Sequence, residues 1–228
     1  MNIACIQHVD FESPGVIETW AKKGNHFFQI FKPYKAEAFP NPTDFDFIIS
    51  MGGPQSPNDA PHLSYLQDEI NFLKKGIEDQ KYVLGFCLGA QLMGEALGGK
   101  TLKSPEKEVG VFPITLTKEG AKDPLFHDFP SSFPVIHWHN DMPGSTQTAV
   151  LLASSQGCPI QGYRYGPRAY GLQFHMEITK KGIQDLMTHA PDDLKPSRFT
   201  QSPDELLQQD YDSIHQQMYV LLDRLSRL

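Results

Sequence analysis

The sequence has 228 residues, of which 39% are hydrophobic and 21% charged, values typical of a globular protein long enough to bury a substantial core as one domain. Its formal net charge of -7 offers no basic surface for phosphate groups, which argues against a nucleic-acid partner. No apolar run approaches the roughly 20 residues of a membrane-spanning helix, and residues 1–10 lack the basic-then-apolar layout of a signal peptide, so we expect a cytoplasmic protein without a membrane partner.

The first half of the chain alternates apolar runs with helical patterns. Runs that suit strands buried on both faces lie at residues 3–9, 26–31, 46–51 and 81–86. Between them, residues 14–23 and 63–77 carry apolar side chains at spacings of three and four, as amphipathic helices do. This order predicts an α/β fold of the flavodoxin-like, doubly wound type, a mostly parallel sheet with helices on both faces. Ligands of such sheets bind beyond the carboxyl ends of the strands.

The second half predicts antiparallel additions to the sheet. Short strand-like segments separated by turns lie at residues 109–117, 134–138, 149–153, 160–164 and 169–174. Ser202 to Glu205 form a capping box with proline at the first helical position. Apolar residues then recur at steps of three and four, which predicts one long C-terminal helix at about 203–228 that covers the sheet or mediates a homodimer. We expect residues 1–228 to form a single domain.

Three cysteines, Cys5, Cys87 and Cys158, are too few and too irregularly spaced for a disulfide framework or a structural zinc site. We expect Cys5, in the middle of a predicted strand, to be buried and inert. Cys158 precedes a proline, and we expect it in a loop or at the surface. Reduced thiols are therefore predicted at all three positions.

Cys87 stands at the junction of the strand 81–86 and a predicted helix 88–97. A side chain at such a turn is held above the sheet at a helix N-terminus, whose dipole favours a thiolate. The tight turn requires small neighbours, which Gly85 and Gly89 supply. The pattern predicts a nucleophile elbow, and the alternative is a buried, unreactive thiol.

A base and an oxyanion hole would complete a nucleophilic site. His175 and Glu177 lie near the end of a predicted strand, and extended residues two apart point the same way, so the carboxylate could orient the imidazole toward Cys87. Alone, this pair is a weak signal, because most of the nine histidines must be structural or surface groups. Gly53, after the third strand, and Leu88 could aim backbone N–H groups at a developing negative charge, although a glycine pair is also common in ordinary turns.

Three motifs occur in the order found in class I glutamine amidotransferases: Gly52-Gly53-Pro54, the Gly-x-Cys-x-Gly-x-Gln of residues 85–91, and the His-x-Glu of residues 175–177. Residues 1–179 resemble that family, and most of all stand-alone relatives of the amidotransferase domain of GMP synthase. The resemblance implies that Cys87 attacks the side-chain amide of glutamine, that His175 passes the proton to the leaving ammonia, and that Glu177 orients His175. A γ-glutamyl thioester would form and be hydrolysed to glutamate.

The resemblance also implies how the substrate is held. Gly52 and Gln91 would help to bind it, and the backbone of a segment that includes Asn140 and Asp141 would grip its α-amino and α-carboxyl groups. His137 and His139 of the same segment could ligate zinc, but no third carboxylate or histidine stands at a convincing spacing. We therefore predict neither a metal nor another cofactor.

The sequence departs from the family in two ways. The usual His-Pro-Glu has Met176 in its middle here, so the fixed φ of proline is missing. Only a loop and the predicted long helix follow the amidotransferase-like part, so the acceptor of any ammonia would be a separate synthase subunit. Two alternatives stay open: a γ-glutamyl peptidase that cleaves a larger γ-glutamyl amide, and a non-catalytic binding or regulatory protein of the same fold.

Overall fold

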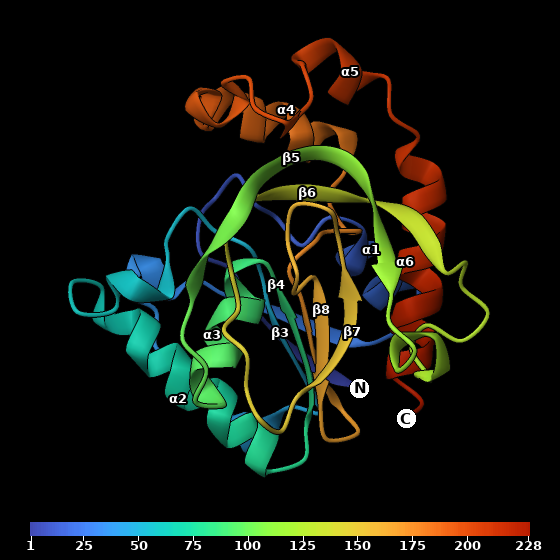
Figure 1. The fold of residues 1–228 in the computed structure, drawn as a ribbon. Coiled ribbons are helices and arrows are strands. Elements are labelled where there is room, and N and C mark those ends of the chain that lie inside the picture. Colours follow the sequence, from blue (N-terminus) through green and yellow to red (C-terminus); the bar gives the residue numbers. More distant parts are fainter.

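The computed structural model describes residues 1–228 and contains one ten-stranded sheet (Figure 1). Five neighbouring strands are parallel, in the spatial order β2 (Phe27–Phe31), β1 (Asn2–Ile6), β3 (Phe47–Ser50), β4 (Tyr82–Phe86) and β9 (Ala169–Leu172). Beyond β9 follow β8 (Gly162–Tyr165), β7 (Val150–Ser154) and β5 (Leu102–Leu116), and the pairs β9–β8, β8–β7 and β7–β5 are antiparallel. The long strand β6 (Ser132–Met142) pairs with β5 in antiparallel, and the short β10 (Phe199–Thr200) pairs with β5 in parallel. The predicted parallel sheet with antiparallel additions is confirmed.

Helices cover both faces of the sheet. They are α1 (Val16–Lys23), α2 (Ser64–Glu78), α3 (Leu88–Ala96), α4 (Lys180–His189), α5 (Pro203–Leu207) and α6 (Tyr211–Leu225). Single 3-10 turns are η1 (Pro33–Lys35), η2 (Pro42–Asp44), η3 (Pro57–Asp59), η4 (Gly120–Lys122) and η5 (Pro191–Leu194). None of these helices has the length and apolar character needed to cross a membrane.

Two hydrophobic cores flank the parallel strands, because successive side chains of a strand point to opposite faces. Ile49 and Leu84 belong to the core that includes α1, α4 and α6. Their neighbours Ile48 and Val83 belong to the core formed with α2 and α3. This double burial explains why each of these strands is apolar throughout rather than alternating.

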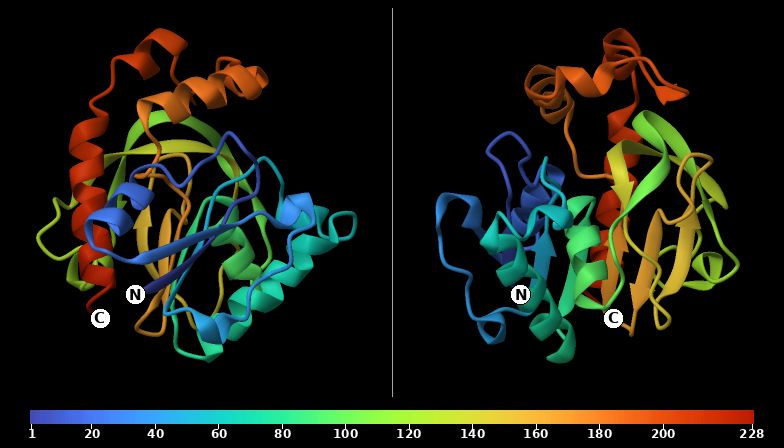
Figure 2. Two further views of the ribbon diagram at one scale, coloured as in Figure 1. Left: turned by 180° about the vertical axis from the view of Figure 1, so that it is seen from behind. Right: turned by 60° about the vertical axis from the view of Figure 1, so that its left-hand side comes forward.

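The C-terminal part differs from the prediction in two respects. The expected single helix is two helices, because Asp210 accepts a hydrogen bond from the N–H of Ser213 at 3.1 Å and starts α6 as a new N-cap. The predicted capping box at Ser202 exists, but it begins only the short α5. Helix α4, which was not predicted, begins at the N-cap Thr179. Figure 2 shows α4 and α5 together at one end of the molecule, beside the bent strands β5 and β6.

The C-terminal helix α6 packs against the sheet core and α1. Trp20 donates its indole N–H to Asp223 at 2.7 Å, and the Nε2 atom of His215 lies 3.0 Å from the carbonyl oxygen of Ile178. The apolar stripe that predicted this helix is buried in the same core. Of the two alternatives that the sequence left open for this stripe, the structure shows that it covers the sheet.

Strands β5 and β6 are longer than predicted. Their pairing extends past the polar residues 103–107, with a register shift between Lys103 and Glu108. The sequence pattern is weak there because several of these side chains are exposed. As a result, residues 137–142 lie at the end of a long strand that reaches over the carboxyl edge of the parallel strands.

Candidate active site

Cys87 occupies a strained turn between β4 and α3. Its φ of 46° and ψ of -105° lie in a region that L-residues rarely adopt. The turn is fixed from both sides, because the N–H of Cys87 donates to Leu172 of β9 at 2.8 Å and the N–H of Gly89 donates to Met51 at 3.1 Å. A Cβ atom on Gly85 would lie 2.6 Å from the backbone of Gly89. The predicted elbow therefore exists, and its neighbouring positions leave no room for a side chain.

His175 and Glu177 form a buried hydrogen-bonded pair. The Nδ1 atom of His175 lies 2.6 Å from Oε1 of Glu177, and both side chains are almost fully buried. The chain at His175 is held by two backbone hydrogen bonds with Ile136 of β6, at 2.8 and 3.0 Å. Met176, which replaces the expected proline, donates its N–H to Oε2 of Glu177 at 3.0 Å. Proline could not supply this bond, so the departure gives the carboxylate one more donor.

Cys87 and His175 both line the same cleft, and their side chains interact directly. Burial alone would lower the pKa of His175, but the Glu177 carboxylate and a hydrogen bond with Cys87 raise this pKa well above its ordinary value. A positively charged imidazole beside a thiol is the arrangement that favours a thiolate in cysteine nucleophiles. The sulfur also lies 3.7 Å from the carbonyl oxygen of Trp138.

The glycine turn after β3 faces this pair. A Cβ atom on Gly52 would lie 3.0 Å from Cε1 of His175 and 3.7 Å from Cβ of Cys87. One on Gly53 would lie 2.9 Å from Cδ2 of Leu88. The N–H of Gly53 donates to no backbone acceptor, and Leu88 is the first residue of α3, where N–H groups have no partner within the helix. Two backbone N–H groups without backbone partners therefore belong to segments that pack against each other beside the elbow.

A buried ion pair that the sequence did not reveal supports this glycine turn. The Nδ1 atom of His8 lies 3.1 Å from the carbonyl oxygen of Gly52, and its Nε2 atom lies 2.8 Å from Glu69 of α2. Ser50 donates to the other oxygen of Glu69 at 2.6 Å. Burial opposes a charge on His8, but Glu69 outweighs it and raises the pKa of His8. The position of His8 two residues after β1 was the only signal in the sequence.

A cleft of about 400 Å³ opens above the sulfur. Its wall contains the predicted site residues Gly53, Cys87, Gln91, Asn140, Asp141 and His175. Gly52 and Glu177 line a small adjoining pocket. Gln91 donates to Gln173 at 3.0 Å, whereas Asp141 accepts from Ser56 at 3.1 Å and from Lys103 at 3.2 Å. Of the predicted substrate-binding residues, Gln91, Asn140 and Asp141 therefore lie in one cleft with the thiol, whereas Gly52 lies in the adjoining pocket.

Helix α4 and η5 close one side of the cleft. Trp138 of β6 donates its indole N–H to Asp193 at 2.8 Å. The ring of His189 stacks on Phe11 with the ring centroids 4.4 Å apart. All four residues line the cleft, and the sequence did not reveal this wall because the pattern of α4 was not recognised as a helix.

Glu12 lies at the junction of the cleft and the small adjoining pocket. Its Oε2 atom would be 2.6 Å from a Cβ atom on Gly52, so the carboxyl group faces the same turn as His175. Burial raises the pKa of Glu12 to about 7, although His175 and His8 oppose this shift. Apart from its place after β1, no feature of the sequence marks this residue as part of the site.

The raised pKa of Glu12 predicts a pH-dependent loss of stability. Between pH 4.5 and 7 the folded protein keeps a proton that the unfolded chain has released, so the free energy of unfolding falls as the pH rises through this window. Relative to wild type, we expect Glu12→Gln to gain about 2 kcal/mol between pH 5 and pH 8. Urea unfolding at several pH values measures this difference. Glu18→Gln, on the exposed side of α1, is the control, and parallel profiles for wild type and Glu12→Gln would contradict the prediction.

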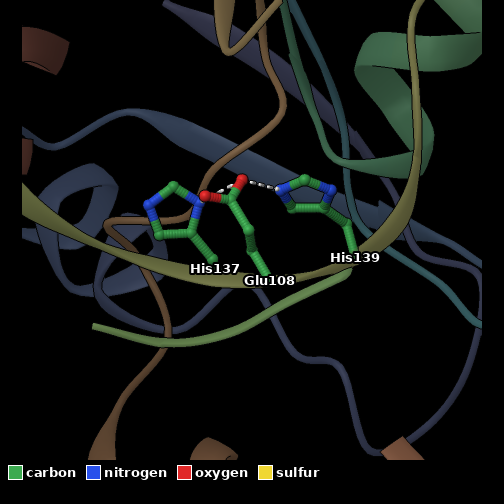
Figure 3. A group of neighbouring side chains, drawn as sticks. All are labelled: Glu108, His137 and His139. Atoms are coloured by element: carbon green, nitrogen blue, oxygen red, sulfur yellow. Dashed lines mark ion pairs between the residues drawn. The ribbon is translucent and has the colours of Figure 1, made fainter. Parts of the chain in front are cut away.

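A second buried cluster lies next to the cleft. Figure 3 shows the carboxylate of Glu108 between the imidazoles of His137 and His139. The pairing of β5 with β6 places Glu108 opposite His139, although the two are distant in sequence. Glu108 is thus the third potential metal ligand beside His137 and His139, and spacing along the chain could not reveal it. The potential ligand atoms of the three residues all lie within 4.8 Å of one another.

The remaining cysteines differ in how well their surroundings were predicted. Cys5 is fully buried, and burial raises its pKa far above the usual range, as expected for an inert thiol. Cys158 lies in a loop as expected, but it is buried rather than exposed, with its sulfur 3.3 Å from the carbonyl oxygen of Ile160. All three cysteines are free.

Comparison with known proteins agrees with this geometry. A family model described as glutamine amidotransferase class-I matches residues 24–188. The chain is 38% identical over 234 residues to YfeJ of Salmonella typhimurium strain LT2, named as a glutamine amidotransferase-like protein, and the match covers 99% of this chain and 98% of YfeJ. It is 37% identical over 136 residues to the glutamine-hydrolysing GMP synthase of Lacticaseibacillus rhamnosus, a match that covers 58% of this chain and 24% of that synthase. The crystal structure of a glutamine amidotransferase from Thermotoga maritima has the same fold, with a TM-score of 0.90, 23% identity, and coverage of 100% of this chain and 99% of the other.

Proposed function

The chain belongs to the class I glutamine amidotransferase family, and from that premise we propose that it hydrolyses the side-chain amide of glutamine through a cysteine thioester. The observation that carries the proposal is the arrangement at the elbow. A thiol in a strained turn at a helix N-terminus lies beside an imidazole, which a buried carboxylate holds at 2.6 Å. These are the parts that nucleophilic acyl transfer requires.

In the proposed reaction, the Cys87 thiolate attacks the δ-carbon of glutamine. The carbonyl oxygen becomes an oxyanion, which the N–H groups of Gly53 and Leu88 stabilise. His175 then gives its proton to the amide nitrogen, the carbon–nitrogen bond breaks, and ammonia leaves. His175 next takes a proton from water, whose oxygen attacks the thioester; the carbon–sulfur bond breaks, glutamate leaves, and the thiolate and the protonated His175 are restored. Glu177 keeps the ring of His175 in the required orientation throughout.

The proposed binding mode uses the remaining cleft residues. Gln91 and Gly52 hold the side-chain amide near Cys87, and the segment with Asn140 and Asp141 binds the α-amino and α-carboxyl groups. Asp141 already accepts bonds from Ser56 and Lys103, so its carboxylate is held in place at the rim of the cleft. The whole unit, residues 1–228, acts as one domain in this proposal, and the ammonia would pass to a separate synthase subunit.

The direct test is to incubate the purified chain with glutamine and to measure ammonia and glutamate. We expect equal amounts of both products. If the chain alone is inactive, the assay is repeated with synthase subunits that use ammonia, because amidotransferase subunits can depend on their acceptor. No release of ammonia under either condition would refute the glutaminase proposal.

The size of the cleft favours a second candidate, the hydrolysis of a larger γ-glutamyl amide. A volume of about 400 Å³ lies within the range of pockets that bind ligands larger than one amino acid. The same thioester would form, and an amine rather than ammonia would leave. A panel of γ-glutamyl amides with increasing amine size distinguishes the two. Cleavage of glutamine far faster than every larger amide would rule out this candidate.

A non-catalytic binding protein of the same fold is the remaining alternative. Its thiol would have no reason to be reactive, whereas the proposed site predicts fast alkylation of Cys87 by iodoacetamide at neutral pH. Protection of Cys87 by glutamine would link this reactivity to the cleft. Slow alkylation, with a rate typical of an ordinary thiol, would favour the binding protein.

Loss of the charge at Glu177 should reduce turnover strongly. In Glu177→Gln the ring of His175 loses the carboxylate that raises its pKa, and the thiolate loses its cationic partner. We expect kcat to fall by roughly 10²- to 10⁴-fold with a smaller change in KM. Steady-state kinetics measure this, with Glu119→Gln on the exposed surface as the control. An unchanged kcat would show that Glu177 does not act through His175.

A further inference from the structure

The buried cluster of Glu108, His137 and His139 contains a negative charge without a fixed positive partner. The carboxylate of Glu108 is 1% exposed, and the groups that pair with it are the two histidines, at 3.7 Å and 3.2 Å. A buried carboxylate is costly unless a cation or a metal compensates it. The hydroxyl of Ser155 donates to it at 2.8 Å but carries no charge.

The two imidazoles have the orientation of metal-binding histidines: one ring nitrogen faces the cluster and the other contacts a backbone carbonyl oxygen. The Nε2 atom of His137 lies 3.2 Å from the carbonyl oxygen of Phe112, and the Nδ1 atom of His139 lies 3.1 Å from that of Asp141. A carbonyl oxygen only accepts, so these outer nitrogens carry the hydrogens. Each ring therefore points its other nitrogen at Glu108, and a backbone carbonyl behind each ligand is the usual second partner of a metal-bound histidine.

Gln161 supplies a fourth polar group that lies close to the other three. Its Nε2 atom lies 2.7 Å from Oε2 of Glu108, 3.2 Å from Nδ1 of His137 and 3.1 Å from Nε2 of His139. Four ligands at 2.0–2.2 Å around a tetrahedral zinc ion are separated by about 3.3–3.6 Å. The cluster approaches this tetrahedron, since most of its edges are 2.7–3.7 Å and none exceeds 4.8 Å.

The amide of Gln161 also leaves a polar atom unpaired. Its Oε1 atom is buried and has no hydrogen-bond partner. Rotation of the amide by half a turn exchanges its oxygen and nitrogen, which places Oε1 at the fourth corner as a neutral ligand. A cation at the centre would then bind two nitrogens and two oxygens, and it would neutralise Glu108.

We propose that Glu108, His137, His139 and Gln161 form a binding site for a divalent metal ion of the zinc type. One carboxylate, two imidazoles and one amide oxygen suit zinc better than calcium or magnesium, which prefer oxygen ligands alone. The ion would be structural. It would fix the end of β6, where Trp138 contacts Cys87 and where Asn140 and Asp141 line the cleft.

The test uses the full chain carrying Cys87→Ala, so that the thiol of the cleft cannot bind the metal. The protein is stripped with a chelator, dialysed, and titrated with Zn²⁺ and separately with Co²⁺. We expect one ion per chain, a rise in Tm on adding Zn²⁺, and the strong visible absorption of four-coordinate cobalt. Binding of no ion at micromolar concentrations would overturn the proposal.

Variants then locate the ion. Glu108→Gln, which preserves shape, should weaken binding of Zn²⁺ at least 100-fold, whereas His127→Gln, at an exposed histidine, should not change it. Equal binding by Glu108→Gln would overturn the proposal. Nitrogen NMR of the ring atoms in the unaltered cluster gives a readout that needs no cluster variant. Zn²⁺ should shift Nδ1 of His137 and Nε2 of His139, and a His139 ring that keeps hydrogens on both nitrogens in the presence of Zn²⁺ would show that a proton compensates Glu108 instead.

Discussion

Cys87→Ala should lower kcat for glutamine hydrolysis by roughly 10⁴-fold or more, since the thiol supplies the sulfur atom that carries the acyl intermediate. The variant should fold normally, because alanine adopts the strained turn no less readily than cysteine. Cys158→Ala is the matched control, since Cys158 is also a buried thiol but belongs to a loop outside the elbow motif and does not line the cleft. Mass spectrometry of wild type mixed with substrate should detect a γ-glutamyl adduct on Cys87 alone.

A glycine at position 87 should affect activity and stability in opposite directions. With φ at 46° and ψ at -105°, residue 87 has a conformation that glycine tolerates far better than cysteine. Cys87→Gly should therefore be as inactive as Cys87→Ala but more stable than either the wild type or Cys87→Ala, by about 1 kcal/mol in urea unfolding. An active Cys87→Ala variant would contradict the role of the thiol, and a Cys87→Gly variant less stable than Cys87→Ala would contradict the backbone strain at the elbow.

Gly89→Ala should be among the most damaging single-methyl additions in the chain. A Cβ atom at Gly89 would lie 2.1 Å from the backbone oxygen and 2.5 Å from the hydroxyl of Ser50 on β3. Helix α3 would have to move away from the sheet, which carries Cys87 with it. We expect a loss of about 3 kcal/mol or more in the free energy of unfolding, together with loss of activity.

Gly94, in the same helix, provides the matched control. The nearest atom to a Cβ atom there is Cβ of Pro143 at 3.5 Å, an ordinary contact. Alanine is the better helix former, so Gly94→Ala should be neutral or up to about 1 kcal/mol more stable. Thermal and urea unfolding of both variants measure the contrast. Equal stability of the two would mean that the close approach of α3 to β3 is not required.

The sequence predicted those parts of the fold and site that depend on local pattern. Apolar runs identified the parallel strands, and the glycines around Cys87 identified the elbow. Both could be predicted because each signal is contained within a few consecutive residues. The order of strands then explains why the three motifs meet. β3, β4 and β9 are neighbours and parallel, so their carboxyl ends meet at the same edge of the sheet. Gly52, Cys87 and His175 lie just after these three strand ends and are therefore brought together.

Contacts between distant segments could not be predicted. Glu108 meets His139 only because β5 and β6 pair in one register, and no spacing in the chain encodes that register. The polar part of β5 also lacks the alternation that would have revealed its length. Helix α4 has few apolar residues, of which Ile183 and Leu186 are buried, so its pattern was too weak to separate from a loop. The cleft wall that carries Asp193 was missed for the same reason.

The pairing of β4 with β9 has a consequence for biosynthesis. β4 receives its second neighbour only when residue 169 pairs with residue 83, after the intervening strands β5 to β8 have been made. Until then a nascent chain presents β4 as an open sheet edge, the kind of surface that pairs with other chains. Long-range parallel pairing also slows folding. Translation pauses or truncations before β9 would therefore favour aggregation of a chain whose thiol is already in place but whose imidazole has not yet arrived.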